Sequence, residues 1–309
     1  MAKIIRTVKG DIDPQTTGFN LPHEHLITFP PMRTRTDIDY RLPSVEKAIE
    51  EVNFFKVAGG TILADLTTDG YGRDVKALKQ ISEETGVHVL ATTGFIMQSL
   101  FPNIAFNSTQ DELVELFTKD IKEGMDGTDI KAGWVKCGTS NDSMSGTEEK
   151  VMRAAAKTHH RTGVSVTTHT MAGTMAFTQI NTLFSENVPP DRISIGHVDR
   201  SSLNIGYLKM IAKTGVYLTF DNIGKTKYYP DSVRIDMIKQ LIADGHVKQI
   251  LLADDNGRQS YFRAYGGGPG LDYIPTVFVS MMKEAGISDK DIDQMTVINP
   301  REFMAFEPK

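Results

Sequence analysis

Cysteine and long apolar segments are what this sequence has least of. The 309 residues contain one cysteine, Cys137, so no internal disulfide can form, which fits a reducing compartment. No stretch approaches the roughly 18 apolar residues that a membrane-spanning helix needs, and the start of the chain lacks the apolar core of a signal peptide. We therefore expect a cytoplasmic protein that does not enter a membrane.

Runs of like charge are also missing. The 34 Lys and Arg residues and the 39 Asp and Glu residues are mixed along the chain, and the formal net charge is −5. Proteins that bind nucleic acids or anionic membranes concentrate Lys and Arg in one region. The charge pattern argues against both classes and leaves a small molecule as the expected partner.

Alternating strand-like and helix-like segments are the main feature that is present. Short β-branched and apolar runs are followed by amphipathic stretches, as in repeated βα units around a parallel sheet. Strands are predicted at residues 19–25, 61–67, 87–93, 132–137, 164–169, 192–197, 215–220 and 248–254. Helices are predicted at 44–58, 73–85, 109–124, 147–162, 173–187, 201–213 and 231–244, with an eighth helix and a short helical tail after residue 273. This pattern predicts an α/β fold, a (β/α)8 TIM barrel that forms a single domain over residues 1–309.

Residues that are competent to bind metals stand where five of these strands end. In a (β/α)8 barrel the carboxyl ends of all strands meet at one rim, where active sites are built. The residues in these positions are His23, His25, Lys136, His169, His197 and Asp255. Histidine and carboxylate side chains gathered in this way are typical of a catalytic metal site, so a two-metal hydrolase is the leading hypothesis.

The histidines are placed in a way that packing does not explain. His23 and His25 are two residues apart in an extended segment, so both side chains project to one face and can reach one ion. His169 and His197 close the fifth and sixth strands, whereas barrel interiors prefer Val, Ile and Leu. The other histidines, which we interpret as structural, are His88, His159, His160 and His246.

The eighth strand ends in two aspartates that face opposite ways. A carboxylate beside a metal can bind the ion and also accept the proton of the attacking water, so it suits a general base. We expect Asp255 to enter the barrel in this role, and Asp254 to be bound to backbone or to a neighbouring loop.

Lys136 is the least expected residue of the group. An ammonium cannot ligate a cation and would repel two of them. Either Lys136 forms an ordinary ion pair near the barrel mouth, or its amine is carboxylated by carbon dioxide. The resulting carbamate has two oxygens that can bridge two metals.

Taken in order, these residues resemble the phosphotriesterase-like branch of the amidohydrolase superfamily over nearly the whole chain. The resemblance is carried by residues 18–25 (GFNLPHEH), 65–74 (DLTTDGYGRD), 93–95 (TGF), 135–136 (VK), 168–170 (THT), 196–199 (GHVD), Asp255 and 299–300 (NP). An ordered series of this kind is much more specific than any one motif.

The resemblance implies a site with two divalent metal ions, usually zinc, with manganese or cobalt as alternatives. His23, His25 and Asp255 would bind one ion, and His169 and His197 the other. Lys136, N6-carboxylated, would bridge both together with a hydroxide that attacks the substrate. Membership is also compatible with a homodimer.

Substrate choice depends on the last two loops, because the family hydrolyses phosphotriesters, lactones, N-acyl compounds and related esters. These loops carry Lys225, Lys227, Tyr228, Arg258 and Tyr261. Lys and Arg suit a phosphate because they form charge-assisted hydrogen bonds, and barrels often bind phosphates with these loops. The pattern resembles the subgroup that opens phosphorylated sugar lactones. It favours a lactonase acting on a phosphorylated pentono-1,4-lactone, with Lys225, Lys227, Arg258 and Tyr261 binding the phosphate far from the metals.

Two alternatives stay open. The same machinery would suit uncharged substrates, such as N-acyl-homoserine lactones or organophosphates, and a barrel of this kind can also serve as a non-catalytic binding protein. Where many relatives carry a tyrosine after the third strand, this chain has Phe95, Ile96 and Met97, which predicts a differently shaped pocket. Trp134 is interpreted as a core residue.

Overall fold

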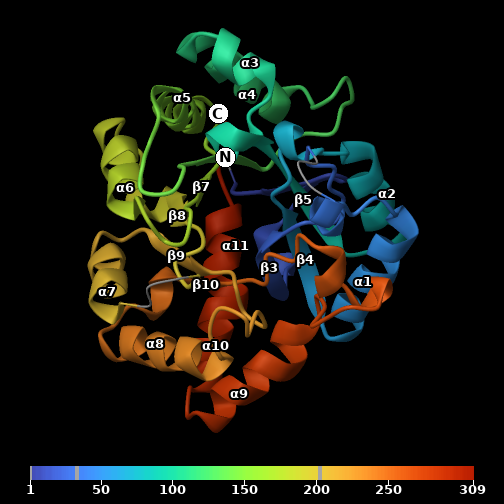
Figure 1. Ribbon diagram of the computed structural model, residues 1–309, viewed down its shortest axis with the longest axis vertical. Helices are drawn as coiled ribbons and strands as arrows, with labels where there is room; N and C mark the ends of the chain where they lie inside the picture. Colours follow the sequence, from blue (N-terminus) through green and yellow to red (C-terminus); the bar gives the residue numbers. More distant parts are fainter. Residues whose placement is uncertain (1, 32–34, 201–203) are drawn as a thin grey trace.

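The computed structural model describes residues 2–31, 35–200 and 204–309. Its centre is a sheet of eight parallel strands in sequence order, closed into a barrel (Figure 1). The strands are β3 (Phe19–Glu24), β4 (Gly60–Asp65), β5 (His88–Gly94), β6 (Trp134–Gly138), β7 (Val166–His169), β8 (Ile193–Ile195), β9 (Tyr217–Phe220) and β10 (Ile250–Leu252). A hydrogen bond of 3.0 Å from the Asp255 amide to the His23 carbonyl links the last strand to the first. The eight predicted strands and the barrel are confirmed.

Helices surround the barrel, as the amphipathic segments predict (Figure 1). They are α1 (Val45–Val57), α2 (Val75–Thr85), α3 (Asn103–Asn107), α4 (Gln110–Lys122), α5 (Gly146–Thr162), α6 (Ala176–Ser185), α7 (Ile205–Lys213) and α8 (Asp231–Ala243). Capping explains several of the boundaries. Thr109 and Ser145 each form a capping box with a glutamate, and Gly163 ends α5 in the left-handed conformation. The first residues of the helix predicted at 201–213 lie outside the described residues.

The C-terminal part is more extensive than the short tail that was predicted. A π-helical turn η9 (Ile274–Phe278) continues into α9 (Val279–Glu284), which corresponds to the predicted eighth helix because α3 was not predicted. It is followed by α10 (Asp289–Asp293), η10 (Gln294–Ile298) and α11 (Asn299–Met304). The Asn299 side chain donates to the carbonyls of Val247 and Ile250, and so ties this tail to the start of β10.

An N-terminal hairpin that the sequence pattern did not predict lies at the amino end of the barrel. It consists of β1 (Ile5–Thr7) and β2 (Gly10–Ile12), and Ile4 pairs with Phe306 near the other end of the chain. Ile5, Trp134 and Phe303 belong to one buried cluster there, and the rings of Trp134 and Phe303 are 5.0 Å apart. Trp134 is therefore a core residue, as predicted.

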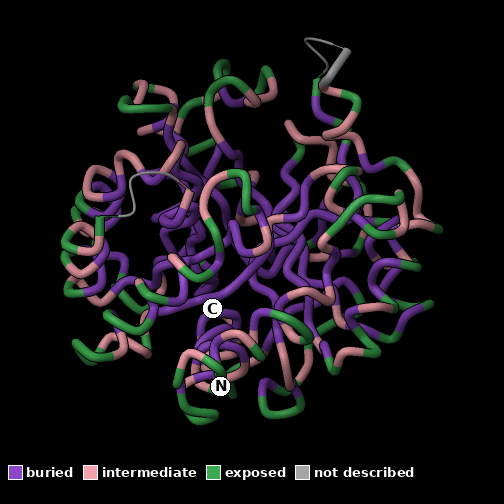
Figure 2. Tube along the Cα trace, turned by 60° about the horizontal axis from the view of Figure 1, so that its bottom comes forward, coloured by how far each residue is buried: buried purple, intermediate pink, exposed green. Residues whose placement is uncertain are grey.

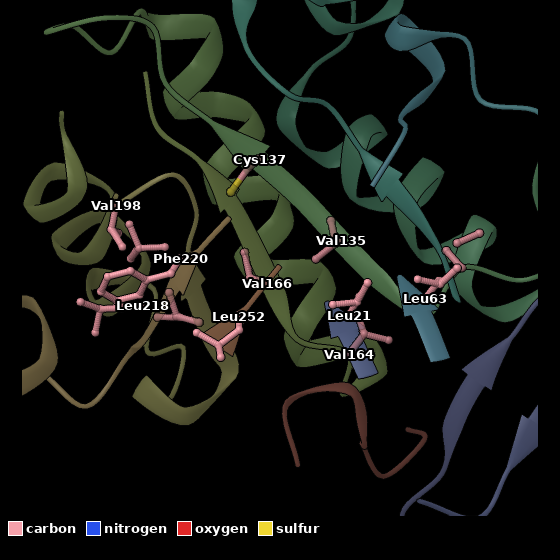
Figure 3. Close-up of a cluster of buried hydrophobic side chains, with 14 of the residues drawn as sticks. Leu21, Leu63, Val135, Cys137, Val164, Val166, Val198, Leu218, Phe220 and Leu252 are labelled. Carbon is pink, nitrogen blue, oxygen red and sulfur yellow. The ribbon is translucent and has the colours of Figure 1, made fainter. Parts of the chain in front are cut away.

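Alternation along the strands separates the core from the site. Outward-facing side chains such as Leu21, Val135 and Leu218 belong to the large cluster beneath the helices (Figure 3). Buried positions occupy the centre of the molecule, and exposed ones lie on the surrounding helices and loops (Figure 2). Because Trp134 and Lys136 are two apart on β6, both face the barrel interior, Trp134 at the amino end and Lys136 towards the carboxyl end. Within the part of the chain described, no helix combines the length and apolarity needed to cross a membrane.

Candidate metal centre

The six residues predicted for the metal site line one cavity at the carboxyl ends of the strands. The cavity has a volume of about 310 Å3. Its lining includes His23, His25, Lys136, His169, His197 and Asp255. All except Asp255 are buried. Strand ends that are up to 232 residues apart in the chain thus converge, because a closed parallel barrel places every strand's carboxyl end on the same rim.

One group of donors comes from β3 and β10. Asp255 Oδ1 lies 3.3 Å from His25 Nε2 and 3.7 Å from His23 Nε2. The ligand atoms of these three residues all lie within 4.8 Å of one another. Three side chains from two adjacent strands therefore present two ring nitrogens and a carboxylate oxygen to one point.

The second group comes from the ends of β7 and β8, and Lys136 of β6 lies close to both groups. His197 Nε2 lies 2.8 Å from His169 Nδ1, and Lys136 Nζ lies 3.2 Å from His23 Nε2. The other near contact of Lys136 Nζ is the Leu66 carbonyl at 3.5 Å. Lys136 thus lies between the two groups, and among the described residues it forms no ion pair with a carboxylate. Burial lowers the pKa of Lys136 to about 8, which favours the neutral amine that reacts with carbon dioxide.

Asp221, which the sequence interpretation did not single out, connects the two groups. Its carboxylate oxygens lie 2.8 Å from His23 Nδ1 and 2.8 Å from His197 Nδ1, and one of them also accepts from the His197 amide. Although burial favours the neutral acid, His197 and His23 hold the pKa of Asp221 well below its usual range. The available signal was its place directly after the seventh strand, the same place that the other site residues occupy.

The outer ring nitrogens of three histidines each have a hydrogen-bond partner outside the cavity, which orients the rings so that Nε2 faces inward. Asp221 engages Nδ1 of His23 and of His197, and Thr67 Oγ1 lies 2.8 Å from Nδ1 of His25. A proton held on Nδ1 leaves the Nε2 lone pair facing the cavity. Burial lowers the pKa of His23 to about 3, so its ring is neutral at pH 7. Neutral imidazoles and a carboxylate are a donor set that fits zinc and similar divalent cations.

Backbone strain coincides with two of these residues. His197 has a φ of 59° and Asp255 a φ of 47°, in the left-handed region that non-glycine residues rarely adopt. Each is held by its own amide hydrogen bond, to Asp221 Oδ2 for His197 and to the His23 carbonyl for Asp255. The surrounding contacts therefore stabilise the conformations that turn both side chains into the cavity.

The neighbouring acids do not enter this cavity. Glu24 accepts the backbone amides of Asp254 and Asn256, at 2.8 and 3.0 Å. Asp254 is thus bound through its own amide, whereas its buried carboxylate has no hydrogen-bond partner among the described residues. The sequence interpretation expected the Asp254 carboxylate to bind backbone or a loop. The local turn instead directs the Glu24 carboxylate to the backbone of residues 254–256.

The predicted cationic residues occupy different depths. Lys225 lies deepest, with Nζ 3.0 Å from Asp255 Oδ2 and 2.7 Å from the Asp255 carbonyl. The sequence predicts a position far from the metals, and this prediction is wrong: Lys225 is buried next to Asp255, because the loop after β9 turns back towards β10. Lys227 is exposed, and its Nζ lies 5.0 Å from the Tyr228 ring centre.

Tyr261 stands at the centre of the cations. Its ring centre lies 5.2 Å from Lys225 Nζ, 5.0 Å from Lys227 Nζ and 5.7 Å from the guanidinium carbon of Arg258. Tyr228, Arg258 and Tyr261 line the cavity together with the metal-competent residues. Asp255 at Lys225 and Asp39 near Arg258 offset part of this charge, and the positive charge that remains suits an anionic group.

Further lining residues were not identified from the sequence. Arg200, whose guanidinium carbon lies 5.3 Å from the Tyr228 ring centre, comes from the loop after β8. Tyr71 follows β4, and its ring lies 5.4 Å from that of His25. Tyr40 belongs to η2 (Arg35–Tyr40), in the loop after β3. Their only sequence signal was a position in a loop that follows a barrel strand.

The segment after β5 forms an apolar wall. Ile96, Met97 and Leu100 line the cavity, whereas Phe95 is buried against Phe117, with ring centres 5.3 Å apart. The differently shaped pocket predicted for this segment is thus lined here by apolar side chains and by no tyrosine from residues 95–97.

The remaining histidines lie elsewhere. His159 Nδ1 donates to the Val164 carbonyl at 2.7 Å, and His160 Nε2 lies 2.7 Å from the Glu186 carbonyl. Both are on α5, outside the barrel, whereas His88 is the first residue of β5 and His246 precedes β10, both at the amino ends of the strands, opposite the cavity.

Comparison with known proteins agrees with this architecture. A profile described as "Phosphotriesterase family" matches residues 3–304. The phospho-furanose lactonase of Mycoplasmopsis synoviae is 32% identical over 329 aligned positions, which cover 99% of this chain and 93% of that protein.

Two solved structures are similar over nearly their whole length. The crystal structure of a lactonase from Listeria monocytogenes superposes with a TM-score of 0.94 at 38% identity, and covers 98% of this chain and 99% of that one. The phosphotriesterase homology protein of Escherichia coli, described as complexed with phosphate in the active site, has a TM-score of 0.90 at 34% identity. That match covers 95% of this chain and 100% of the other.

Proposed function

This chain belongs to the phosphotriesterase family and is a hydrolase acting on ester bonds, and from that premise we propose that it opens phosphorylated furanose lactones. The observation that carries the proposal is the position of Tyr261. Three cations surround its ring, and it lines the same cavity as the metal-competent residues. A lactone ester and a phosphate on one small sugar would contact both ends of that cavity.

The proposed metal donors divide into two sets, as the family resemblance implies. His23, His25 and Asp255 would hold one divalent cation, and His169 and His197 a second. Lys136 would bridge them as its carbamate, since it is buried between the two groups with no carboxylate partner among the described residues. When bound, two such cations lower the pKa of a coordinated water and polarise the substrate oxygen.

Asp255 is suited to move the proton. Lys225 engages its Oδ2 at 3.0 Å, while Oδ1 faces His25 and the cavity. In lactone hydrolysis, water adds to the ring carbonyl, the bond from that carbon to the ring oxygen breaks, and the ring oxygen must gain a proton. Asp255 would take the proton from the attacking water and return it to the departing oxygen. Ile96 and Met97 add apolar surface to one side of the cavity.

The phosphate end would be formed by Arg258, Lys227, Tyr228 and Tyr261. Arg258 can donate two parallel hydrogen bonds to a phosphate, and Lys227 adds charge. The phosphate in the active site of the Escherichia coli relative supports the binding of an anion in the active-site cavity. Lys225 adds positive charge on the side of Tyr261 that is nearest Asp255, although its hydrogen bonds go to Asp255.

The test compares a 5-phosphorylated pentono-1,4-lactone with the same lactone without phosphate on zinc-loaded enzyme. We expect kcat/KM to favour the phosphorylated compound strongly. Arg258→Met should lower kcat/KM for that compound by on the order of 30-fold or more, equivalent to about 2–4 kcal/mol of transition-state binding. Turnover of the unphosphorylated lactone should change little.

Arg263→Met is the matched control. Arg263 lies five positions further along the same loop, but it pairs with Asp272 at 2.5 Å and stacks over Phe54. This variant should retain the phosphate preference. Equal turnover of both lactones by the wild-type enzyme, together with a silent Arg258→Met, would refute the phosphate assignment.

The apolar wall favours a second candidate. Ile96, Met97 and Leu100 would suit the uncharged part of an N-acyl-homoserine lactone or an organophosphate. On such substrates Arg258→Met should leave kcat/KM nearly unchanged, whereas Met97→Asp should lower it. The two variants together distinguish the candidates.

A further inference from the structure

Arg258 is held by a segment far from its own loop. Asp39 Oδ2 lies 3.5 Å from Arg258 Nη1, and Arg258 Nη2 donates to the Tyr40 hydroxyl. The guanidinium carbon lies 3.9 Å from the centre of the Tyr40 ring and 5.7 Å from that of Tyr261. Arg258 is therefore confined by two aromatic rings and two polar groups at the mouth of the cavity.

Asp39 also binds the backbone of the loop that carries Arg258. Its Oδ1 accepts the Ser260 amide at 2.9 Å, and its Oδ2 accepts the Ser260 hydroxyl at 2.8 Å. Next to this contact, Gln259 Nε2 donates to the Arg41 carbonyl at 2.8 Å. Residues 39–41 thus hold η7 (Gln259–Tyr261), and with it both Arg258 and Tyr261.

We propose that Asp39 is a positioning residue for the anion-binding end of the pocket, acting through Ser260 and Arg258. The inference rests on the proposed function, because it takes the partner of Arg258 to be a phosphate on the substrate. It adds the loop after β3 to the determinants of specificity. Asp39 does not contact the reacting ester, which would lie with the metal donors.

The geometry decides which of two opposite effects Asp39 has. As a nearby anion it could compete with the substrate phosphate for Arg258, but its contact with the guanidinium is 3.5 Å long, beyond the usual range of a strong hydrogen bond. Its two bonds to Ser260 are short. Holding the loop is therefore the larger effect. A long arginine side chain that is already confined loses less freedom when it binds an anion.

The experiment uses zinc-loaded enzyme and the two lactones described above. Asp39→Asn keeps the side-chain size but cannot accept the amide and the hydroxyl of Ser260 equally well. We expect its KM for the phosphorylated lactone to rise about 3- to 10-fold, with kcat within about twofold and with the kinetics of the unphosphorylated lactone unchanged. Ser260→Ala, which removes only the hydroxyl contact, should give a smaller rise.

A double variant separates positioning from general stability. If Asp39 acts through Arg258, adding Asp39→Asn to Arg258→Met should cause no further loss of phosphate preference. Glu46→Gln is the control, since Glu46 is exposed and likewise accepts from a serine hydroxyl, that of Ser44 at 2.7 Å, at the start of α1. Losses that add in the double variant, or losses that are equal for both lactones, would overturn the proposal. So would a lower KM of Asp39→Asn for the phosphorylated lactone.

Hydrogen exchange tests, without any substrate, whether Asp39 holds the loop at Ser260. In zinc-loaded Asp39→Ala enzyme, a peptide covering residues 258–262 should exchange faster than in the wild type, because alanine has no side-chain oxygen to accept the Ser260 amide. Unchanged exchange overturns the positioning role. If the variant exchanges faster but the wild-type enzyme shows no preference for the phosphorylated lactone, the positioning role of Asp39 is supported and the proposed substrate is refuted.

Discussion

At the scale of single residues, Asp221 has the most consequential contacts. One buried carboxylate engages a histidine from β3 and another from β8, and so orients one donor of each proposed metal. Asn222 Nδ2 in turn donates to Asp221 at 3.0 Å, while Asp199 accepts from the Asp221 and Asn222 amides. The charge of Asp199 is compensated by buried Arg234 at 2.8 Å. Ligand orientation therefore depends on a connected buried network.

Replacing Asp221 by Asn should weaken zinc binding by about 10- to 100-fold, as loss of such supporting contacts does in other metal sites. An amide cannot accept from His23 and His197 as a carboxylate does, so the two ring tautomers are no longer fixed together. Zinc affinity can be measured by competition with a chromophoric chelator. Asp244→Asn, which alters an exposed carboxylate paired with Lys209, serves as the control. Equal affinities in both variants would contradict the proposed role of Asp221.

At the scale of elements, α5 shows how a helix is joined to the strand it precedes. A capping box at Ser145 begins it, Gly163 ends it, and buried His159 in its last turn donates to the Val164 carbonyl just before β7. Burial lowers the pKa of His159 to about 4. The neutral ring is therefore part of the packing between the end of α5 and the start of β7.

The pH dependence of stability should report this packing. His159 has a lower pKa in the folded protein than in the unfolded chain, so the unfolded chain binds more protons between about pH 6.5 and 4. The contribution of neutral His159 to the free energy of unfolding is fully present above pH 6.5. It is lost as the pH falls towards 4, and the total loss is about 3 kcal/mol. Denaturation of the wild type and of His159→Asn at pH 7 and pH 4.5 should show their stability difference shrinking. The exposed neighbour variant His160→Asn is the control, and a pH-independent difference for His159→Asn would contradict this account.

At the scale of the whole molecule, the candidate metal centre connects five strands. Its residues come from β3, β6, β7, β8 and β10, which span most of the barrel circumference. Bound ions would therefore stabilise the closed barrel rather than one loop. Cytoplasmic location and dimer formation stay predictions of the sequence.

Removing the metals should lower the thermal stability of the entire barrel in one transition. For ligand present at about 1,000 times its Kd the stabilisation is about 4 kcal/mol, which corresponds to about 10 °C in Tm for a protein of this size. Calorimetry of chelator-treated and zinc-loaded protein measures it. If Lys136 is carboxylated as proposed, recovery on adding zinc should be faster with bicarbonate, which supplies the carbon dioxide for the carbamate. Equal Tm values with and without metal would contradict a resident metal site.

Much of the architecture was accessible from the sequence because the relevant signals are local. Most strands are short apolar or β-branched runs, and each proposed metal residue stands at or near the carboxyl end of one. In a parallel barrel that position alone determines which rim a side chain occupies. The histidines, Lys136 and Asp255 could therefore be assigned to one site although they are far apart in the chain.

The contacts that refine the site were decided only by the tertiary structure. The bonds between Asp39 and Ser260 join residues that are 221 positions apart, and Asp221 bridges two histidines from different strands. Lys225 turned towards Asp255 although its sequence context suited the outer rim equally well. The N-terminal hairpin of β1 and β2 packs at the amino end of the barrel, although no periodic pattern in the sequence predicts it. Strand periodicity specifies which rim and which face of the barrel a residue occupies, whereas the partner of a loop side chain depends on how distant loops fold over one another.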